Sequence, residues 1–212
     1  MEIPGIPAPL LTALSRAGVG PVALVGGAVR DLLLHRLHND PWRGLPDLDL
    51  VVQGRASELV KELVDALAGQ LGEGVVQRCQ EHGAYGTVEL ELSLDGQQVL
   101  LDVATARCDT YPVPAENPQV SFGSLADDLA RRDFSINAMA LDLVSGTLLD
   151  PHGGQADLEL RQLRFLHDGS VRDDPTRLVR GARYAARLGL ELDGASAAQA
   201  AATLAQWPWP WR

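Results

Sequence analysis

Apolar residues recur along the chain with two different periods, and these periods predict its secondary structure. A period of two, or a short continuous apolar run, is typical of a strand, whereas intervals of three and four are typical of an amphipathic helix. Strands are predicted at 22–25, 47–52, 85–94 and 99–104, and helices at 28–37, 57–71, 125–143, 155–165 and 175–188. This order predicts a mixed α/β region up to about residue 143, with a helical region after it.

Turn and capping residues separate these elements. Asp95-Gly96 is a tight-turn signal that joins the last two strands into a predicted hairpin. Ser57 is expected to cap the second helix, and Asp174 before Pro175 predicts the start of the last one, because proline loses no amide donor at a first helical position. The segment 111–124 contains three prolines and shows no periodicity, so a long loop is predicted there.

The composition is that of a globular protein with a normal core, because 46% of the 212 residues are hydrophobic. No apolar stretch reaches the ~18 residues that span a bilayer, and the N-terminal residues do not resemble a secretion signal. We therefore expect a cytoplasmic protein with no membrane partner. Cys79 and Cys108 are too few for a disulfide framework or a zinc site.

Charge is distributed unevenly along the chain. The net charge of −10 argues mildly against nucleic-acid binding, because phosphate contacts need clustered basic residues. Residues 1–126 carry 16 acids against 8 bases, whereas residues 127–187 carry 10 acids against 9 bases, all of them arginine. Arginine binds phosphate bidentately, so this later segment is where we expect contacts with a phosphate-containing partner.

Two aspartates in the second predicted strand are the first candidate site. Asp47 and Asp49 are two residues apart, so a strand would present both carboxylates on one side, where they could hold Mg²⁺. A solvated surface pair is the usual alternative for two isolated aspartates. The preceding Gly26-Gly27 favours the metal site over the surface pair, because glycine permits close backbone approach and the helix that follows offers amide donors to a phosphate. A tight turn without a ligand is the alternative for the two glycines.

Arginines next to aspartates form three further candidates. Arg30-Asp31 follows the two glycines and could equally be a surface ion pair. Arg132 and Asp133 are expected on a helix, where one could bind phosphate and the other could accept from a ribose hydroxyl, unless both are ordinary exposed charges. The third candidate is a series of arginines at intervals of three residues, which predicts a basic ridge on one helix. Its members are Arg177, Arg180 and Arg183, with Arg187 one turn further, and Asp174 precedes them.

These motifs, taken in order, resemble those of class II tRNA nucleotidyltransferases, the bacterial and eukaryotic-type CCA-adding enzymes, and of their relatives, the bacterial poly(A) polymerases. The resemblance covers the chain from about 20 to 190. The segments that carry it are 26–31 with 47–49, 131–140 (RRDFSINAMA), 150–154 (DPHGG) with 157–158, and 173–177 (DDPTR).

The resemblance implies a polymerase-β-like nucleotidyltransferase head, with a small mixed or antiparallel sheet and helices, over residues 1–145. An all-α, partial neck over 146–212 would follow, with the body and tail of the family absent. The family usually has glutamate where this chain has Asp173. The end of the chain, with tryptophans at 207, 209 and 211, is interpreted as a truncated or frameshifted end rather than as an RNA-stacking surface.

The resemblance also implies roles for single residues. Asp47 and Asp49 would bind the metal, and Asp102 would be a third acidic residue of the catalytic site. The expected nucleotide-binding residues are Gly26, Gly27 and Arg30 at the triphosphate, Arg132 and Asp133 at phosphate and ribose, and Asp174 and Arg177 at the base, with Asn137, Arg180 and Arg183 completing the nucleotide pocket. Asp174 and Arg177 would act as a protein template that hydrogen-bonds CTP or ATP.

The implied reaction is Mg²⁺-dependent addition of C, A or both to the 3′ end of a tRNA from CTP or ATP, with release of pyrophosphate; Mn²⁺ is the expected substitute metal. Poly(A) addition is an alternative within the family. A non-catalytic nucleotide- or RNA-binding remnant is an alternative from another class, because the chain is short and acidic. Glycosyl transfer from a sugar nucleotide would use the same metal chemistry but would leave the later arginine motifs unexplained.

Overall fold

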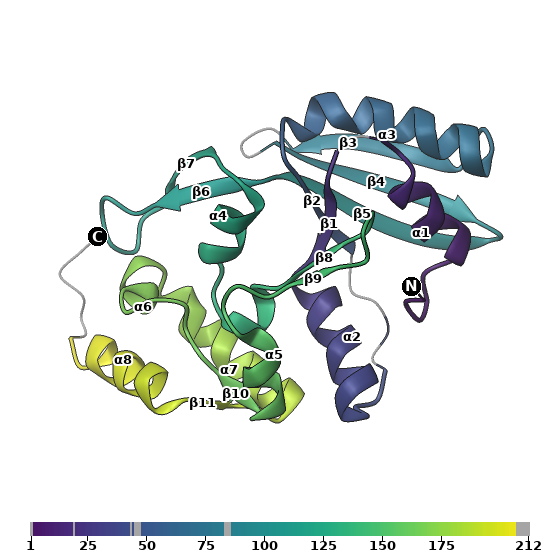
Figure 1. The fold of residues 1–212 in the computed structure, drawn as a ribbon. Helices are drawn as coiled ribbons and strands as arrows, with labels where there is room; N and C mark the ends of the chain where they lie inside the picture. The colour runs from purple at the N-terminus through teal and green to yellow at the C-terminus, as the bar shows by residue number, and fades with distance from the viewer. Residues whose placement is uncertain (1, 19, 43, 45–47, 83–85, 207–212) are drawn as a thin grey trace.

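A mixed sheet forms the centre of the computed structural model, which describes residues 2–18, 20–42, 44, 48–82 and 86–206 (Figure 1). Within these residues the sheet has seven strands, in the order β3 (Val76–His82), β4 (Thr87–Leu94), β5 (Gln97–Thr105), β2 (Leu48–Val52), β1 (Val22–Val25), β8 (Ala140–Asp142) and β9 (Leu148–Leu149). Strands β2 and β5 are parallel, and the other neighbours are antiparallel. The mixed sheet and the predicted hairpin β4–β5 are therefore confirmed.

Helices and two short strand pairs surround this sheet. The helices are α1 (Ala8–Ser15), α2 (Gly27–His38), α3 (Ala56–Leu71), α4 (Leu125–Ala130), α5 (Gly154–Glu159), α6 (Ser170–Asp173), α7 (Thr176–Leu188) and α8 (Gly194–Leu204), with a 3₁₀ turn η1 at Ser135–Asn137. The strand pairs are β6 (Arg107–Thr110) with β7 (Gln119–Phe122), and β10 (Gln162–Leu163) with β11 (Glu191–Leu192). Helix α3 covers β3, β4 and β5, whereas α5 to α8 gather below the sheet in Figure 1.

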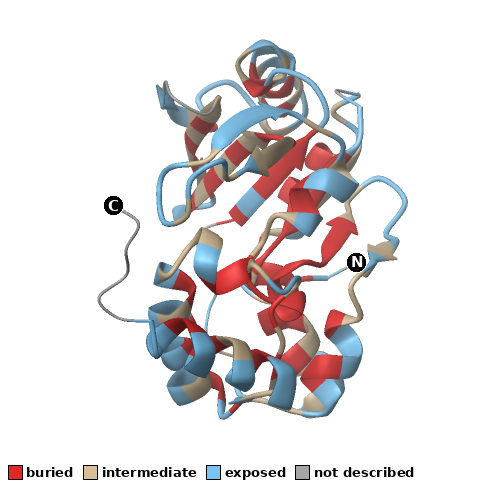
Figure 2. Cartoon of the chain, turned by 90° about the vertical axis from the view of Figure 1, so that its left-hand side faces the viewer, coloured by how far each residue is buried: buried red, intermediate tan, exposed pale blue. Residues whose placement is uncertain are grey.

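The hydrophobic core lies between the sheet and its helices, as the buried strands at the centre of Figure 2 show. Leu48, Leu50 and Val52 are buried, whereas Asp49 between them is exposed, so β2 has the predicted polar position on its other face. Phe134 extends the core toward the last helices: its ring stacks on Phe165 at 4.8 Å and meets the edge of Tyr184 at 5.9 Å. None of the described helices is long and apolar enough to cross a membrane.

The predicted helix 125–143 is wrong. Helix α4 ends at Ala130, and the chain then forms the turn η1 and strand β8. One cause is local: Asp133 Oδ1 accepts from the amide of Phe134, a bond that competes with a continuous helix. The other cause is tertiary, because β8 pairs with β1 and the apolar residues that suggested a helix are buried in the core instead. Asp133 is therefore not on a helix.

Four smaller expectations also differ from the structure. Strand β7 lies within the predicted loop 111–124, and α5 stops well before the predicted helix end at 165, with Arg161 at a φ of 57° and β10 after it. Ser57 does not cap α3, which starts at Ala56; the hydroxyl of Thr105 accepts from the Ala56 amide instead. Strand β3 was not predicted, because its largely exposed residues show no apolar alternation.

The division between the predicted head, 1–145, and neck, 146–212, stays a prediction. Strand β9 at Leu148–Leu149 belongs to the seven-stranded sheet and lies just after the predicted boundary. Beyond it, the described residues form helices and the short β10–β11 pair.

Candidate active site

One cavity of about 650 Å³ collects the predicted site residues. It lies where the ends of β1, β2 and β5 meet the start of α2, the segment after α4, and helix α7. The predicted residues in its lining are Gly26, Gly27, Arg30, Asp49, Asp102, Arg132, Asp133, Asn137, Asp174, Arg177, Arg180 and Arg183. Asp47, the other predicted metal ligand, lies outside the described residues. The roles of all these residues stay predictions, but their gathering around one cavity is a structural fact.

Two carboxylates face the cavity from adjacent strands. Asp49 on β2 and Asp102 on β5 are partners in the parallel ladder, so their side chains project from the same face of the sheet. Carboxylate oxygens are the ligands that Mg²⁺ prefers, so this pair fits the predicted metal. Among the described residues, which exclude Asp47, no group of three or more His, Cys, Asp or Glu side chains is arranged to hold a metal ion.

Gly26 brings the backbone close to this pair. Its φ is 69°, a value that side chains disfavour, and a Cβ there would lie 3.0 Å from Nη1 of Arg132 and 3.6 Å from Oδ2 of Asp49. Helix α2 starts at the next residue, Gly27, and its N-terminus is at the cavity wall. The strand-to-helix turn therefore offers the positive end of a helix next to two carboxylates, an arrangement suited to a triphosphate with metal.

Arg30 and Asp31 form a buried ion pair, so the surface pair considered above is wrong. Arg30 Nε donates to Asp31 Oδ1 at 2.8 Å, and its Nη1 donates to Asn137 Oδ1 at 2.7 Å. The guanidinium also lies 5.0 Å from the ring centre of Tyr184. Arg187 on α7 adds a second cation to Asp31 at 3.3 Å. Arg30 thus ties α2 to η1 and α7, and a contact with triphosphate stays a prediction.

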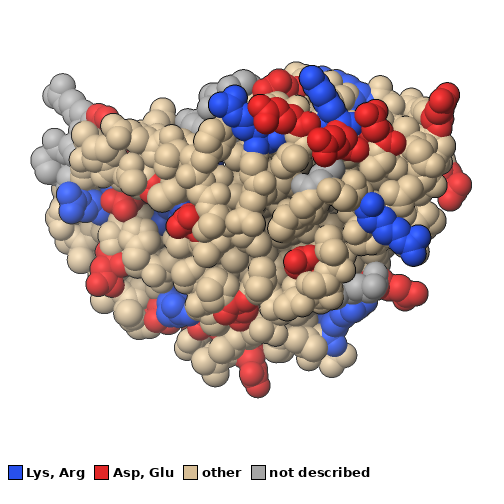
Figure 3. Space-filling view, turned by 45° about the horizontal axis from the view of Figure 1, so that its top comes forward, with Lys and Arg blue, Asp and Glu red and all other residues tan. Residues whose placement is uncertain are grey.

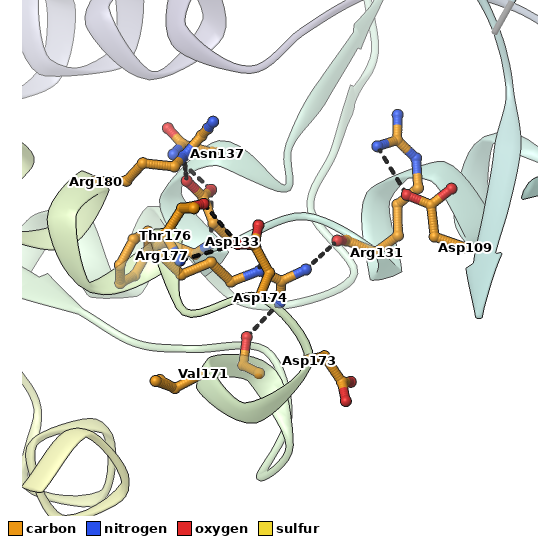
Figure 4. A network of polar contacts seen from close by, with 12 residues as sticks. Asp109, Arg131, Asp133, Asn137, Val171, Asp173, Asp174, Thr176, Arg177 and Arg180 are labelled. Carbon is orange, nitrogen blue, oxygen red and sulfur yellow. Dashed lines mark hydrogen bonds and ion pairs between the residues drawn. The ribbon is translucent and has the colours of Figure 1, made fainter. Parts of the chain in front are cut away.

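Asp133 is the acceptor at the centre of a polar network (Figure 4). Its Oδ1 accepts from Nδ2 of Asn137 at 2.9 Å, and its Oδ2 accepts from Nε of Arg180 at 2.7 Å. Burial works to lower the pKa of Arg180, but the charge of Asp133, the influence of Tyr184 and the hydrogen bonds to both together outweigh burial and raise that pKa above its ordinary value. Asp133 therefore joins the segment after α4 to helix α7 across the cavity.

Arg177 is buried, with 3% of its surface exposed, so the predicted basic ridge is only partly exposed. Its Nη2 donates to the carbonyl of Arg131 at 2.9 Å, its Nη1 donates to the Ser170 hydroxyl, and its Nε lies 3.9 Å from Asp174 Oδ2 (Figure 4). Asp174 accepts from the amide and hydroxyl of Thr176 through Oδ1; it was predicted as the cap of this helix, but it lies one residue before the observed cap position, Pro175. Arg180 and Arg183, further along α7, are exposed.

Several lining residues were missed by the motif analysis. Arg107, Asp109 and Tyr111 reach the cavity from β6 and the residue after it, and burial, the largest influence, raises the pKa of Tyr111. Asp128, beneath the cavity, was also missed, although its spacing of three and four residues from Arg131 and Arg132 is the spacing of helical ion pairs. The sequence therefore contained a signal for Asp128.

Arginines outnumber aspartates in the cavity lining. The arginines are Arg30, Arg107, Arg131, Arg132, Arg177, Arg180, Arg183 and Arg187, and the aspartates are Asp49, Asp102, Asp109, Asp133 and Asp174. On the face seen in Figure 3, by contrast, acidic and basic side chains are intermingled. A chain with a net charge of −10 thus has a cavity suited to an anion.

Comparison with known proteins agrees with this geometry. The chain is 45% identical over 172 residues to the CC-adding tRNA nucleotidyltransferase of Deinococcus radiodurans, covering 80% of this chain and 41% of that protein. It is 37% identical over 185 residues to the A-adding tRNA nucleotidyltransferase of Halalkalibacterium halodurans, covering 85% and 39%. A solved structure of a CCA-adding enzyme in an apo form superposes with a TM-score of 0.77 and 31% identity, covering 95% of this chain and 46% of that one.

The chain thus spans about two fifths of these two curated relatives. The model of the poly A polymerase head domain matches residues 22–164, which is more than half of the chain. The matched segment contains the glycine turn, both described carboxylates, and Asp133 with its partner Asn137. The chain therefore belongs to the family of tRNA nucleotidyltransferases and poly(A) polymerases that share this head domain.

Proposed function

We propose that this chain is the catalytic part of an RNA nucleotidyltransferase that adds C, A or both to tRNA 3′ ends, without a nucleic-acid template and with release of pyrophosphate. One observation carries the proposal: a single cavity holds the Asp49–Asp102 pair, the Gly26 turn, Arg132 with Asp133, and Asp174 with Arg177. The names of the relatives support tRNA as the acceptor. The cytoplasm is its proposed location.

The residues suggest a division of roles within the cavity. Asp49 and Asp102, with Asp47, would hold Mg²⁺, which supplies activation of the attacking hydroxyl and neutralises charge on the phosphates. The N-terminus of α2 and Arg132 would orient the triphosphate beside these carboxylates. Asp133 would accept from the ribose, and Asp174 with Arg177 would present an acceptor and a donor to the base edge.

The base that is added is the finer part of the proposal. Relatives named as A-adding and as CC-adding enzymes match this chain at comparable identity, so the activities to be distinguished are full CCA addition, CC addition and A addition. Incubation with Mg²⁺, labelled CTP or ATP, and tRNAs ending before CCA, after C, or after CC distinguishes these activities. Repeated A addition to any RNA would indicate poly(A) polymerase activity.

Substitution of a carboxylate tests the catalytic assignment. Asp49→Asn should lower incorporation about a thousandfold, because loss of a metal ligand costs several kcal/mol of transition-state stabilisation. Asp95→Asn, at the exposed turn of the β4–β5 hairpin, removes the same charge far from the cavity lining and should leave incorporation unchanged. Wild-type incorporation by Asp49→Asn would contradict the assignment. Binding of nucleotide or tRNA by the wild-type chain without any incorporation would favour the non-catalytic nucleotide- or RNA-binding remnant.

A further inference from the structure

We infer that Asp128 is a positioning residue for the nucleotide pocket. It holds Arg132 at the phosphate end of the pocket, next to Gly26, and it holds Arg131, whose backbone contacts Arg177 at the base end. This inference rests on the proposed function, since it concerns the same cavity. Asp128 lies on α4, does not line the cavity, and belongs to none of the motifs discussed above.

Each oxygen of the Asp128 carboxylate binds one guanidinium. Oδ1 accepts from Nε and Nη2 of Arg131 at 3.0 and 2.6 Å, and Oδ2 accepts from Nε and Nη2 of Arg132 at 3.3 and 2.7 Å. The Asp128 side chain is 0% exposed, whereas those of Arg131 and Arg132 are 20% and 16% exposed. A buried anion thus holds two cations that reach the cavity wall.

The charge of Asp128 is maintained by these two partners. Burial works to raise the pKa of the Asp128 carboxyl, but the charges and hydrogen bonds of Arg132 and Arg131 together outweigh burial and hold that pKa below its ordinary value. Removing the carboxylate charge would leave two partly buried guanidinium groups without their shared acceptor, which is unfavourable in a poorly solvated site. Their side chains would then rearrange toward other acceptors.

The two ends of the pocket depend on these side chains in different ways. At the phosphate end, Nη1 of Arg132 and Oδ2 of Asp49 both lie next to Gly26. If Arg132 lost its contact with Asp128, the acceptor near its guanidinium would be Asp49, a predicted metal ligand. At the base end, the carbonyl of Arg131 accepts from Nη2 of Arg177 at 2.9 Å, and Nη1 of Arg131 lies 3.6 Å from Asp109. Asp128 therefore orients two residues of the cavity lining directly, Arg131 and Arg132, and Arg177 through the backbone of Arg131.

Nucleotide binding to the intact chain provides the test, because it needs no tRNA. The dissociation constants of CTP and ATP in Mg²⁺ are measured by calorimetry for the wild type and for Asp128→Asn, together with the melting temperature. We expect Asp128→Asn to weaken binding of both nucleotides about tenfold, since hydrogen bonds to a charged group contribute about that much. Asp127→Asn makes the same chemical change at the adjacent, exposed acid of the α4 capping box, and should leave the dissociation constants unchanged.

A double-mutant cycle separates positioning from a general structural role. If Asp128 acts through Arg132, then Asp128→Asn should add little to the loss already caused by Arg132→Gln. Additive losses, or wild-type binding by a folded Asp128→Asn protein, would overturn the inference. If Asp128→Asn does not fold, Asp128→Glu replaces it, since this variant keeps the charge and displaces it by one methylene. Asp128→Glu should weaken nucleotide binding less than tenfold but more than Asp127→Asn does. Wild-type binding by Asp128→Glu would also overturn the inference. Failure of the wild type to bind either nucleotide would instead contradict the proposed function.

Discussion

Gly26 and Asp128 show how single residues shape the cavity, the first from within the predicted nucleotide-binding residues and the second from outside them. At Gly26, the backbone conformation and the nearness of Arg132 both exclude a side chain. At Asp128, a buried charge orients two arginines. The glycine could be recognised from the sequence, because it ends an apolar run at the start of a helix. The spacing of Asp128 from Arg131 and Arg132 indicated its ion pairs, but not its burial, because the same spacing is equally typical of an exposed helix.

Gly26→Ala should weaken nucleotide binding and lower the free energy of unfolding. An alanine at a φ of 69° is strained by about 1–3 kcal/mol, and its methyl group would press against Nη1 of Arg132. Gly146→Ala is the matched control, since Gly146 has a φ of 70° and no neighbour within 4 Å of its Cβ position. Denaturant unfolding and calorimetry should show loss of stability in both variants but loss of binding only in Gly26→Ala; equal binding by the two would refute the contact argument.

The lowered pKa of Asp128 predicts a specific pH dependence of stability. Because the pKa is lower in the folded state, the carboxylate stabilises the fold fully above its ordinary pKa of about 3.9, and this contribution is lost as the pH falls through the folded-state value. Melting temperatures between pH 7 and pH 2 should therefore fall less steeply for Asp128→Asn than for the wild type at the acid end. Parallel curves would show that Asp128 contributes no such stabilisation.

At the scale of elements, helix α7 is positioned by its contact with the segment after α4. Gly181 faces the ring of Phe134, and a Cβ at this glycine would lie 2.9 Å from Cζ of that ring. Phe134 is itself fully buried between Phe165 and Tyr184. The close approach places Arg177 and Arg180 of α7 within reach of Arg131 and Asp133, so packing and the site depend on the same glycine.

Gly181→Ala should destabilise the protein even though alanine is the better helix former. The added methyl group overlaps a fully buried ring, and such overpacking costs about 1–3 kcal/mol, against a gain of about 1 kcal/mol from helix propensity. Gly69→Ala, in α3, meets nothing within 4 Å of the new Cβ and should instead stabilise by about 1 kcal/mol. Urea denaturation of both variants measures the difference, and stabilisation by Gly181→Ala would contradict the packing argument.

Among the secondary-structure elements, prediction from the apolar pattern was correct for four strands and wrong for the segment 125–143. Strands β1, β2, β4 and β5 were predicted because each is buried on at least one face and carries an apolar pattern. The segment 125–143 carries an apolar pattern compatible with a helix, yet it forms a short helix, a 3₁₀ turn and a strand. Its conformation is decided by pairing of β8 with β1 and by burial of Phe134, both of which involve residues far away in the sequence.

At the scale of the whole molecule, the cavity is formed jointly by the sheet, α2 and α7. Ion pairs and hydrogen bonds join α7 to α2 and to the segment after α4, from Arg180 to Asp133, from Arg187 to Asp31 and from Arg177 to the carbonyl of Arg131. A nucleotide in the cavity would contact all of these elements, so binding should be linked to the folding of the described region as a unit.

Nucleotide should accordingly stabilise the chain against unfolding. A ligand that binds only the folded state adds about 2.7 kcal/mol to the free energy of unfolding at a concentration of 100 times its dissociation constant. Thermal denaturation with ATP or CTP in Mg²⁺ should show one transition, shifted upward by several degrees. AMP, which lacks the groups expected at the α2 N-terminus, should shift it less. A second transition that does not respond to nucleotide would show that α7 and the sheet unfold independently.

The sequence by itself identified the family and predicted the type of chemistry. Glycines before a helix, paired aspartates and arginine-aspartate motifs are local features, and their order along the chain is independent of how it folds. Tertiary structure alone decided which charges remain available in the cavity, because ion pairs form between residues brought together by packing. Arg30 and Arg177 became buried and hydrogen-bonded, Arg180 was paired with Asp133, and Asp128 acquired two arginines. Burial strengthens each of these interactions, and burial depends on contacts that no local pattern contains.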